Sequence, residues 1–201
     1  MSAEPTIFVV DDDAAVGRAL ASAGKLIGHP VQSFASAAEF LSSYNDEPGC
    51  LVLDIRMPGM TGLELQRLLL DRGVTIPVVM ISGHADVRIA VEAMTLGALT
   101  LLEKPFRLDE LLAHVRKALE KDRLAREERE KTANADARLA ALTAKEREVL
   151  ELIAAGKTNR EMADTLGLSV RAVEDRRARL MKKVNANSVA ELVRLLSARG
   201  G

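Results

Sequence analysis

Cys50-Leu51-Val52-Leu53-Asp54 is a short apolar run that ends in a single carboxylate, and a turn-rich segment follows it at residues 55–62. A run of this kind, bounded by turn residues, is typical of a strand that is buried on both faces of a parallel sheet. In an open α/β sheet, ligands bind in the crevice outside the carboxyl ends of the strands. Asp54 therefore stands where a functional group is expected, although capping a helix is an equally simple role for it.

Strand and helix patterns alternate on both sides of this run. Apolar, β-branched runs predict five strands, at residues 6–10, 31–34, 50–54, 76–81 and 99–102. Apolar residues at helical spacing predict five helices, at residues 16–27, 37–43, 63–70, 85–96 and 108–119. The sequence therefore predicts an α/β fold with a five-stranded doubly wound parallel sheet and helices on both faces.

Charge divides the chain into an acidic front and a basic back. The formal net charge is −6 over residues 1–120, +1 over 121–141 and +4 over 142–201. These three ranges are the predicted sheet domain, a charged helical linker and a second domain. The linker contains no Gly or Pro, which predicts a solvated extension of the fifth helix with a hinge at residues 132–136. The basic back favours a polyanion as partner.

From residue 142 onwards the pattern changes to helices without strands. The first of them carries a capping box at its start, Thr143 with Glu146. Three more helices are predicted at residues 159–166, 170–184 and 188–198, so this second domain is an all-α bundle of four helices. The two middle helices, joined by a turn that contains Gly167, form a helix-turn-helix pattern. Helix 170–184 is strongly cationic, whereas an ordinary solvated helix would carry more acidic residues.

The chain shows no targeting or membrane-spanning pattern. Its N-terminal residues lack a basic region and an apolar core, so we expect no signal peptide. No apolar run approaches the roughly 18 residues that a membrane span requires. The single cysteine, Cys50, excludes an intramolecular disulfide and fits a small core residue. We expect a cytoplasmic protein without membrane contact.

Polar side chains follow four of the five predicted strands: Asp11, Asp12 and Asp13 after the first, Asp54, Ser82 and Lys104 after the others. Each has a simpler role when it is considered alone, such as a helix cap or a solvated loop lysine. Carboxylates that converge on one crevice repel each other unless a cation lies between them, and carboxylate oxygens with open positions suit Mg²⁺. A divalent ion beside a carboxylate, a lysine and a hydroxyl is typical of phosphoryl transfer, with the Asp as nucleophile.

Residues 6 to about 120 resemble the flavodoxin-like receiver domain of bacterial two-component response regulators. The matching motifs are Asp11-Asp12, Asp54, Met57-Pro58-Gly59, Ser82-Gly83 and Lys104-Pro105. The resemblance implies that a sensor histidine kinase phosphorylates Asp54. It also implies that Asp11, Asp12, Asp54 and the carbonyl of Met57 hold Mg²⁺, that Lys104 and Ser82 contact the phosphoryl oxygens, and that the Lys104-Pro105 bond is cis.

One position departs from this family. Receiver domains usually carry Tyr or Phe three residues before the lysine, as a rotamer switch coupled to the Ser or Thr, and this chain has Leu101 there. An aromatic ring that moves between rotamers therefore cannot be the signal in this protein. We expect a less tightly coupled switch.

Residues 142–199 resemble the LuxR-type helix-turn-helix domain, through Glu146-Arg147-Glu148-Val149-Leu150, Gly156-Lys157-Thr158-Asn159, Leu166-Gly167, Val173-Glu174 and Glu191-Leu192. Together with the receiver, the chain resembles the FixJ/NarL family of response regulators. By position, the residues expected to face the major groove are Arg171, Glu174, Asp175, Ala178 and Lys182. Those expected at phosphates are Thr158, Asn159, Arg176, Arg179 and Lys183. Ala172 replaces the Thr that the family often has, which removes one hydroxyl donor.

The resemblance implies a transcription factor that is not an enzyme beyond, at most, removing its own phosphoryl group. Phosphorylation would favour a homodimer, which binds promoter DNA more tightly than a monomer, or it would release a masked DNA-binding domain. A phosphate-independent regulator is one alternative. A haloacid-dehalogenase-type phosphatase is another, in which Asp11 is the nucleophile, but it gives no role to Asp54 or to the basic domain.

Overall fold

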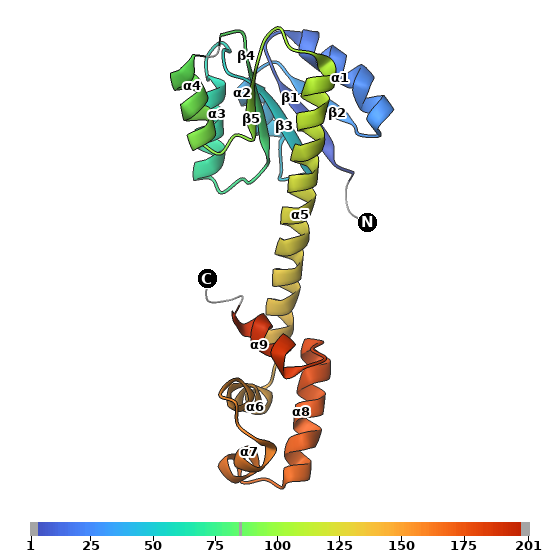
Figure 1. The fold of residues 1–201 in the computed structure, drawn as a ribbon, viewed down its shortest axis with the longest axis vertical. Coiled ribbons are helices and arrows are strands. Elements are labelled where there is room, and N and C mark those ends of the chain that lie inside the picture. Colours follow the sequence, from blue (N-terminus) through green and yellow to red (C-terminus); the bar gives the residue numbers. More distant parts are fainter. Residues whose placement is uncertain (1–3, 85, 198–201) are drawn as a thin grey trace. The chain divides into compact units, whose positions relative to one another are not determined.

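The computed structural model describes residues 4–84 and 86–197 of the chain. Ala85 and Ala198, which we predicted at helix ends, lie outside the described residues. The chain divides into two compact units, residues 1–126 and 127–201. The first unit contains the sheet, and the described part of the second is helical (Figure 1).

The first unit is built on a sheet with five strands: β1 (Thr6–Val10), β2 (Val31–Phe34), β3 (Gly49–Asp54), β4 (Val78–Ser82) and β5 (Thr100–Glu103). Their order is β2-β1-β3-β4-β5 and every neighbouring pair is parallel, which confirms the predicted doubly wound sheet. β4 begins two residues later than predicted, because Pro77 has no amide hydrogen to donate to the ladder. β3 lies at the centre, so Asp54 ends a central strand.

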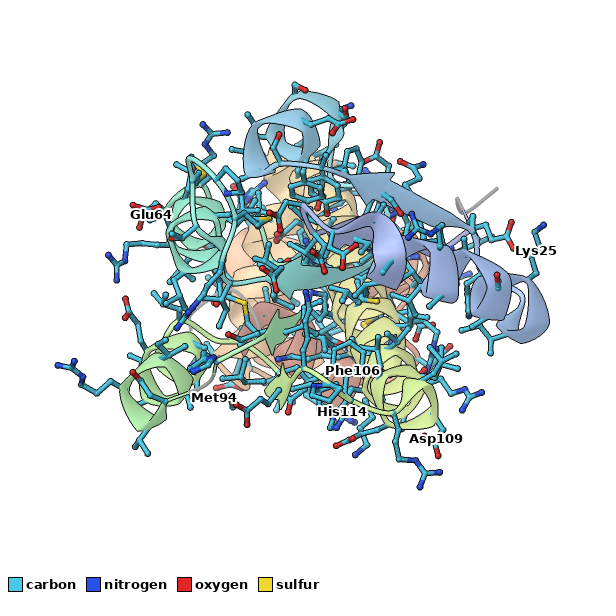
Figure 2. All side chains as sticks on the ribbon, turned by 90° about the horizontal axis from the view of Figure 1, so that it is seen from above. Lys25, Glu64, Met94, Phe106, Asp109 and His114 are labelled. Atoms are coloured by element: carbon cyan, nitrogen blue, oxygen red, sulfur yellow. The ribbon has the colours of Figure 1, made fainter. Side chains whose placement is uncertain are left out.

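Alternate residues along the strands face two apolar layers. Phe8, Leu53 and Met80 pack with α2 (Ala37–Ser43), α3 (Gly62–Asp71) and α4 (Val87–Thr95). Ile7, Val52 and Val79 pack with α1 (Ala14–Ile27) and α5 (Leu108–Ala140). Figure 2 shows Lys25 on α1 and His114 on α5 on one side of the sheet, and Glu64 on α3 and Met94 on α4 on the other. Helices therefore cover both faces, as the alternating pattern predicted.

The loop after β3 is held tightly against the end of that strand. The amide of Gly62 donates to the carbonyl of Ile55 at 3.0 Å. A Cβ atom at residue 62 would overlap the carbonyl oxygen of Asp54, so only glycine fits there. Thr61 and Glu64 form a capping box at the start of α3. These contacts fix the backbone around Asp54 from both sides.

Helix α5 runs without interruption from Leu108 to Ala140, across the border between the two units. The predicted helical extension is confirmed, and it continues through residues 132–136, the segment predicted as a hinge. The prediction that residues 121–131 are only solvated is wrong at one point. The side chain of Asp122 is buried, with 2% of it exposed.

The buried Asp122 ties the extension of α5 to the start of β3. Its carboxylate accepts a hydrogen bond of 2.9 Å from the amide of Gly49. Arg126 donates to the same carboxylate at 2.9 Å, and also to Asp46 at 3.1 Å and to the carbonyl of Glu47 at 3.0 Å. Asp122 thus satisfies both a buried amide and a half-buried guanidinium.

We expect Asp122→Ala to lower the free energy of unfolding by about 3 kcal/mol, because it leaves the buried Gly49 amide without its acceptor and removes the buried carboxylate that pairs with Arg126. Urea unfolding at neutral pH measures this loss. Glu128→Ala on the same helix is the matched control, since Glu128 is exposed and we expect a change within about 0.5 kcal/mol. A loss below about 1 kcal/mol for Asp122→Ala would show that the contact contributes little.

The second unit contains α6 (Ala144–Ala154), α7 (Asn159–Leu166), α8 (Val170–Val184) and α9 (Val189–Ser197). Capping boxes start α6 and α7, and the side chain of Ser169 caps α8. Gly167 ends α7 at a φ of 64°, a backbone conformation that glycine adopts without strain and that closes the turn before α8. A common apolar core holds the helices together, and its members include Val149, Ile153, Met162, Val173, Leu180 and Leu192.

Candidate functional site

The parallel strands bring the polar groups predicted at their ends to one edge of the sheet. In the registers, Val10 pairs with Leu53, Asp54 with Ile81 and Ser82 with Glu103. Asp11 and Lys104 follow β1 and β5 directly. Asp11, Asp54 and Ser82 are buried, at 5%, 4% and 0% exposure, although all three are polar. Buried polar groups need partners, so this edge is a structured site.

Lys104 lies between the two buried carboxylates. Its ammonium nitrogen is 2.8 Å from Oδ2 of Asp11 and 2.9 Å from Oδ1 of Asp54. The remaining oxygen of each carboxylate accepts a backbone amide at 2.9 Å, from Asp13 for Asp11 and from Arg56 for Asp54. Both carboxylates are therefore oriented from two sides. The sequence placed these residues at strand ends but did not predict that one lysine bridges both.

Burial and charge act against each other at this site. Burial raises the pKa of the Asp54 carboxyl above its ordinary value of 3.8, and the hydrogen bond and charge of Lys104 oppose this rise. Burial lowers the pKa of Lys104, but the hydrogen bonds to Asp11 and Asp54 and their charges outweigh it, so the pKa lies above 10.5. Asp54 is thus a partly desolvated carboxylate, a more basic and more nucleophilic group than an exposed one.

Three carboxylates at this edge suit a divalent cation. Oxygen atoms of Asp11, Asp12 and Asp54 all lie within 4.8 Å of one another, and Asp12 is exposed while the other two are buried. Hard oxygen ligands with an open, wet side are the kind of site that Mg²⁺ prefers. Met57 lies in the loop after β3 and is buried, with 7% exposure. Its carbonyl as a further ligand stays a prediction.

Ser82 is bound to the loop that follows it. Its hydroxyl donates to the carbonyl of His84 at 2.8 Å and accepts from the amide of His84 at 3.2 Å. Leu101, next to Met80 in the register, is half-buried against the apolar layer of α2, α3 and α4. The Lys104-Pro105 bond is cis, as the resemblance implied. Ser82 therefore has to leave His84 before it can bind a phosphoryl oxygen.

A second group of candidate residues lies on α8 of the other unit. Val173, Leu180 and Val184 face its core, and the outward positions carry the predicted contacts. Of these, seven side chains on α8 are exposed and Arg176 is half-buried; the exposed ones are Arg171, Glu174, Asp175, Ala178, Arg179, Lys182 and Lys183. Their spacing of three and four residues places Arg171, Glu174, Asp175, Ala178 and Lys182 on one stripe. The stripe carries charges of both signs and the rest of α8 is cationic, which suits the second helix of a helix-turn-helix to the major groove and its phosphates.

Two predicted phosphate contacts have partners that the sequence did not reveal. Lys183 donates to Glu146 at 2.8 Å. The hydrogen bond from Lys183, and then those from the amide and hydroxyl of Thr143, lower the pKa of Glu146 to about 2. Asn159, at the start of α7, contacts Arg177 and Glu174 on α8. Arg177 was not among the predicted residues, because its partner is 18 positions away in the sequence.

Known proteins match both units. Residues 7–116 match the family model described as response regulator receiver domain, and residues 140–196 match that described as bacterial regulatory proteins, luxR family. Nodulation protein W of Bradyrhizobium diazoefficiens is 40% identical over 99% of this chain and 88% of its own length. Transcriptional regulatory protein FixJ of Azorhizobium caulinodans is 43% identical over 96% of this chain and 92% of its own length.

Solved structures agree with these relatives. Response regulator StyR is 38% identical with a TM-score of 0.88, over 98% of this chain and all of the StyR chain. Full-length FixJ from B. japonicum is 38% identical with a TM-score of 0.58, over 98% of this chain and 97% of its own. Among the described residues, every helix is too short or too polar to cross a membrane.

Proposed function

The chain belongs to the transcriptional response regulators that join a receiver domain to a LuxR-type DNA-binding domain, and we propose that phosphorylation of Asp54 controls its binding to DNA. The observation that carries the proposal is the buried Asp54 at the tip of β3, which contacts Lys104 and belongs to a cluster of three carboxylates. We take residues 1–120 as the receiver, 121–141 as the linker and 142–201 as the DNA-binding domain.

The phosphoryl group comes from the phosphohistidine of a sensor histidine kinase. A carboxylate oxygen of Asp54 attacks phosphorus, the bond from phosphorus to the histidine nitrogen breaks, and an acyl phosphate forms. Asp11, Asp12, Asp54 and the carbonyl of Met57 would hold Mg²⁺, which would neutralise charge on the phosphoryl oxygens. Lys104 turns from the carboxylates toward the phosphoryl oxygens. Ser82 leaves His84 and donates its hydroxyl to another of them.

The Ser82 movement reaches the rest of the receiver through Leu101. A leucine that is half-buried in the apolar layer transmits the movement by packing and not by a rotamer change of a ring. We expect Leu101→Tyr to raise the dimer fraction after phosphorylation, because the ring restores the coupling that the family uses. Analytical ultracentrifugation measures the fraction, with Leu101→Met as the control. Equal dimer fractions for wild type and Leu101→Tyr would contradict the weaker switch.

Dimerisation uses the face formed by α4, β5 and the start of α5. Three large apolar side chains on α4 are exposed: Val87 at 80%, Val91 at 60% and Met94 at 50%. Exposed apolar side chains on one helix mark a surface for association. Two linked DNA-binding domains occupy two half-sites more tightly than one domain, so dimerisation controls occupancy.

The DNA contacts divide into two kinds. Thr158, Arg176, Arg179 and Lys183 bind phosphates, and the stripe with Arg171, Glu174, Asp175, Ala178 and Lys182 faces the bases. Lys183 must exchange Glu146 for a phosphate oxygen when it does so. Double-stranded promoter DNA as partner implies that the protein acts in the cytoplasm.

We expect Asp175→Ala to change base preference more than it changes non-specific affinity. Asp175 is exposed, and a carboxylate on the groove side accepts a hydrogen bond from cytosine N4. Sites selected from a random duplex pool by wild type and variant, together with binding to random-sequence DNA, separate the two effects. An unchanged preference with tighter binding to every sequence would mean that Asp175 only repels phosphates.

A phosphatase of the haloacid-dehalogenase type fits less well. Asp13, the second carboxylate of that motif, caps α1 by accepting a hydrogen bond from the amide of Ala15. The relatives are transcription regulators. We propose no catalysis beyond acceptance of the phosphoryl group and its slow hydrolysis from Asp54.

A further inference from the structure

The amide side chain of Asn159 joins two residues of α8. Nη1 of Arg177 donates to Oδ1 of Asn159 at 2.8 Å, and Nδ2 of Asn159 donates to Oε1 of Glu174 at 3.4 Å. Asn159 is the first residue of α7, and α7 lies beside α8 in this unit (Figure 1). These three residues therefore form a relay from α8 to α7 and back to α8.

The chemistry of the three groups permits this orientation alone. A guanidinium only donates hydrogen bonds, and a carboxylate only accepts them. Asn159 has one group of each kind, so its oxygen has to face Arg177 and its nitrogen has to face Glu174. Replacement of either end by a residue of the other kind breaks the relay.

The relay connects the inner side of α8 with its outer stripe. Arg177 lies four residues after the buried Val173 and three before the buried Leu180, and is itself half-buried. Glu174 is exposed on the stripe expected to face the bases. A Glu side chain without contacts samples several rotamers. A Glu side chain whose carboxylate accepts a hydrogen bond within the protein is fixed in one rotamer before a base binds.

We propose that Arg177 is a positioning residue which, through Asn159, holds Glu174 in the orientation that reads a base in the major groove. The inference rests on the proposed DNA-binding function. It gives Asn159 a role in specificity, since its oxygen and one N–H of its amide group are engaged within the protein. A carboxylate held in this way accepts a hydrogen bond from cytosine N4.

The experiment uses the full chain, phosphorylated, and duplexes selected from a random pool. Wild type, Glu174→Ala, Arg177→Leu and Arg177→Lys are compared for base frequencies at each selected position, affinity for random-sequence DNA and thermal midpoint. Arg194→Leu on α9 is the matched control, because it removes one exposed cation outside the relay. Asn159→Asp tests the relay with Arg177 intact, since it keeps the acceptor but turns a second carboxylate toward Glu174.

We expect Glu174→Ala to reduce discrimination at one base position, from about tenfold to about twofold or less. Arg177→Leu and Asn159→Asp should reduce discrimination at the same base position. Arg177→Lys should keep part of this discrimination, and Arg194→Leu should leave it unchanged. Non-specific affinity of Arg177→Leu should match that of Arg194→Leu.

Three results would overturn the inference. One is an unchanged preference in both Arg177→Leu and Asn159→Asp, another is an equal loss at all positions, and the third is no effect of Glu174→Ala. A wild-type protein that enriches no sequence at all would instead contradict the proposed function.

Discussion

Acetyl phosphate with Mg²⁺ is expected to add about 80 Da to the wild-type chain and nothing to Asp54→Ala, in intact-mass measurements. Asp54 is buried, is held in a fixed orientation, contacts a lysine at 2.9 Å and ends the central strand of the sheet. Asp11 contacts the same lysine, but it follows β1, whereas Asp54 ends the central strand β3. Asp11 is expected to bind the metal. The effect is complete loss of the modification, because Asp11, the other buried carboxylate that contacts Lys104, is expected to bind the metal and not to act as the nucleophile.

The control for this result is Asp71→Ala, which removes an exposed carboxylate at the end of α3 and should label as wild type does. Equal thermal midpoints would show that each variant is folded. Omission of Mg²⁺ should prevent labelling of wild type, since the charges of the carboxylates then oppose the incoming phosphoryl group. Continued labelling of Asp54→Ala would place the acceptor elsewhere.

Lys104→Met is expected to lower the free energy of unfolding by about 3 kcal/mol in metal-free buffer at neutral pH. The substitution leaves the buried carboxylates of Asp11 and Asp54 without the cation that lies between them. Removal of one partner from a buried ion pair is strongly destabilising, because the remaining charge is desolvated and unpaired. Lys104 is 27% exposed at its side chain, so the loss lies at the lower end of the range for such pairs.

Mg²⁺ and low pH should both reduce the loss of unfolding free energy caused by Lys104→Met. Mg²⁺ binds the folded state and replaces the missing positive charge, so it should stabilise Lys104→Met more than wild type. Burial already raises the pKa of Asp54, and without Lys104 it rises further. A carboxyl with a raised folded-state pKa favours the folded state at low pH and loses this contribution as pH rises through that pKa. The loss should therefore shrink as pH falls.

Urea unfolding with and without Mg²⁺, from neutral to acidic pH, measures these effects. Lys104→Arg is the control, because it keeps the charge with a different shape. A loss below about 1 kcal/mol for Lys104→Met, together with an unchanged response to Mg²⁺, would show that the bridge seen here does not stabilise the crevice.

The sheet could be predicted from the sequence because its signals are local. A buried β-branched run of four to six residues followed by Asp or Ser indicates a strand with a polar group at its carboxyl end. The alternation of such runs with helical patterns indicates that the strands are parallel. At residues 132–136, predicted as a hinge, the weak helix formers do not interrupt α5. Asn and Asp weaken a helix by less than about 1 kcal/mol each, and this segment has no Gly or Pro to stop it.

The contacts of the candidate sites were harder to predict, because they join residues far apart in the sequence. The spacing of Asp122 and Arg126 indicates a helical ion pair. Gly49, whose amide donates to the buried carboxylate of Asp122, is 73 residues away in the sequence. In the same way, a capping box reveals Glu146 at the start of α6 but not its bond to Lys183. Long-range partners decide which charged residues are free to bind DNA.

The central claim is that the phosphoryl group on Asp54 controls DNA binding. Its most direct test is a titration of a selected duplex with wild type and Asp54→Ala, each with and without acetyl phosphate and Mg²⁺. We predict that phosphorylation tightens wild-type binding at least about tenfold and leaves Asp54→Ala unchanged. Equal affinity of wild type with and without the modification would contradict the claim and favour a phosphate-independent regulator.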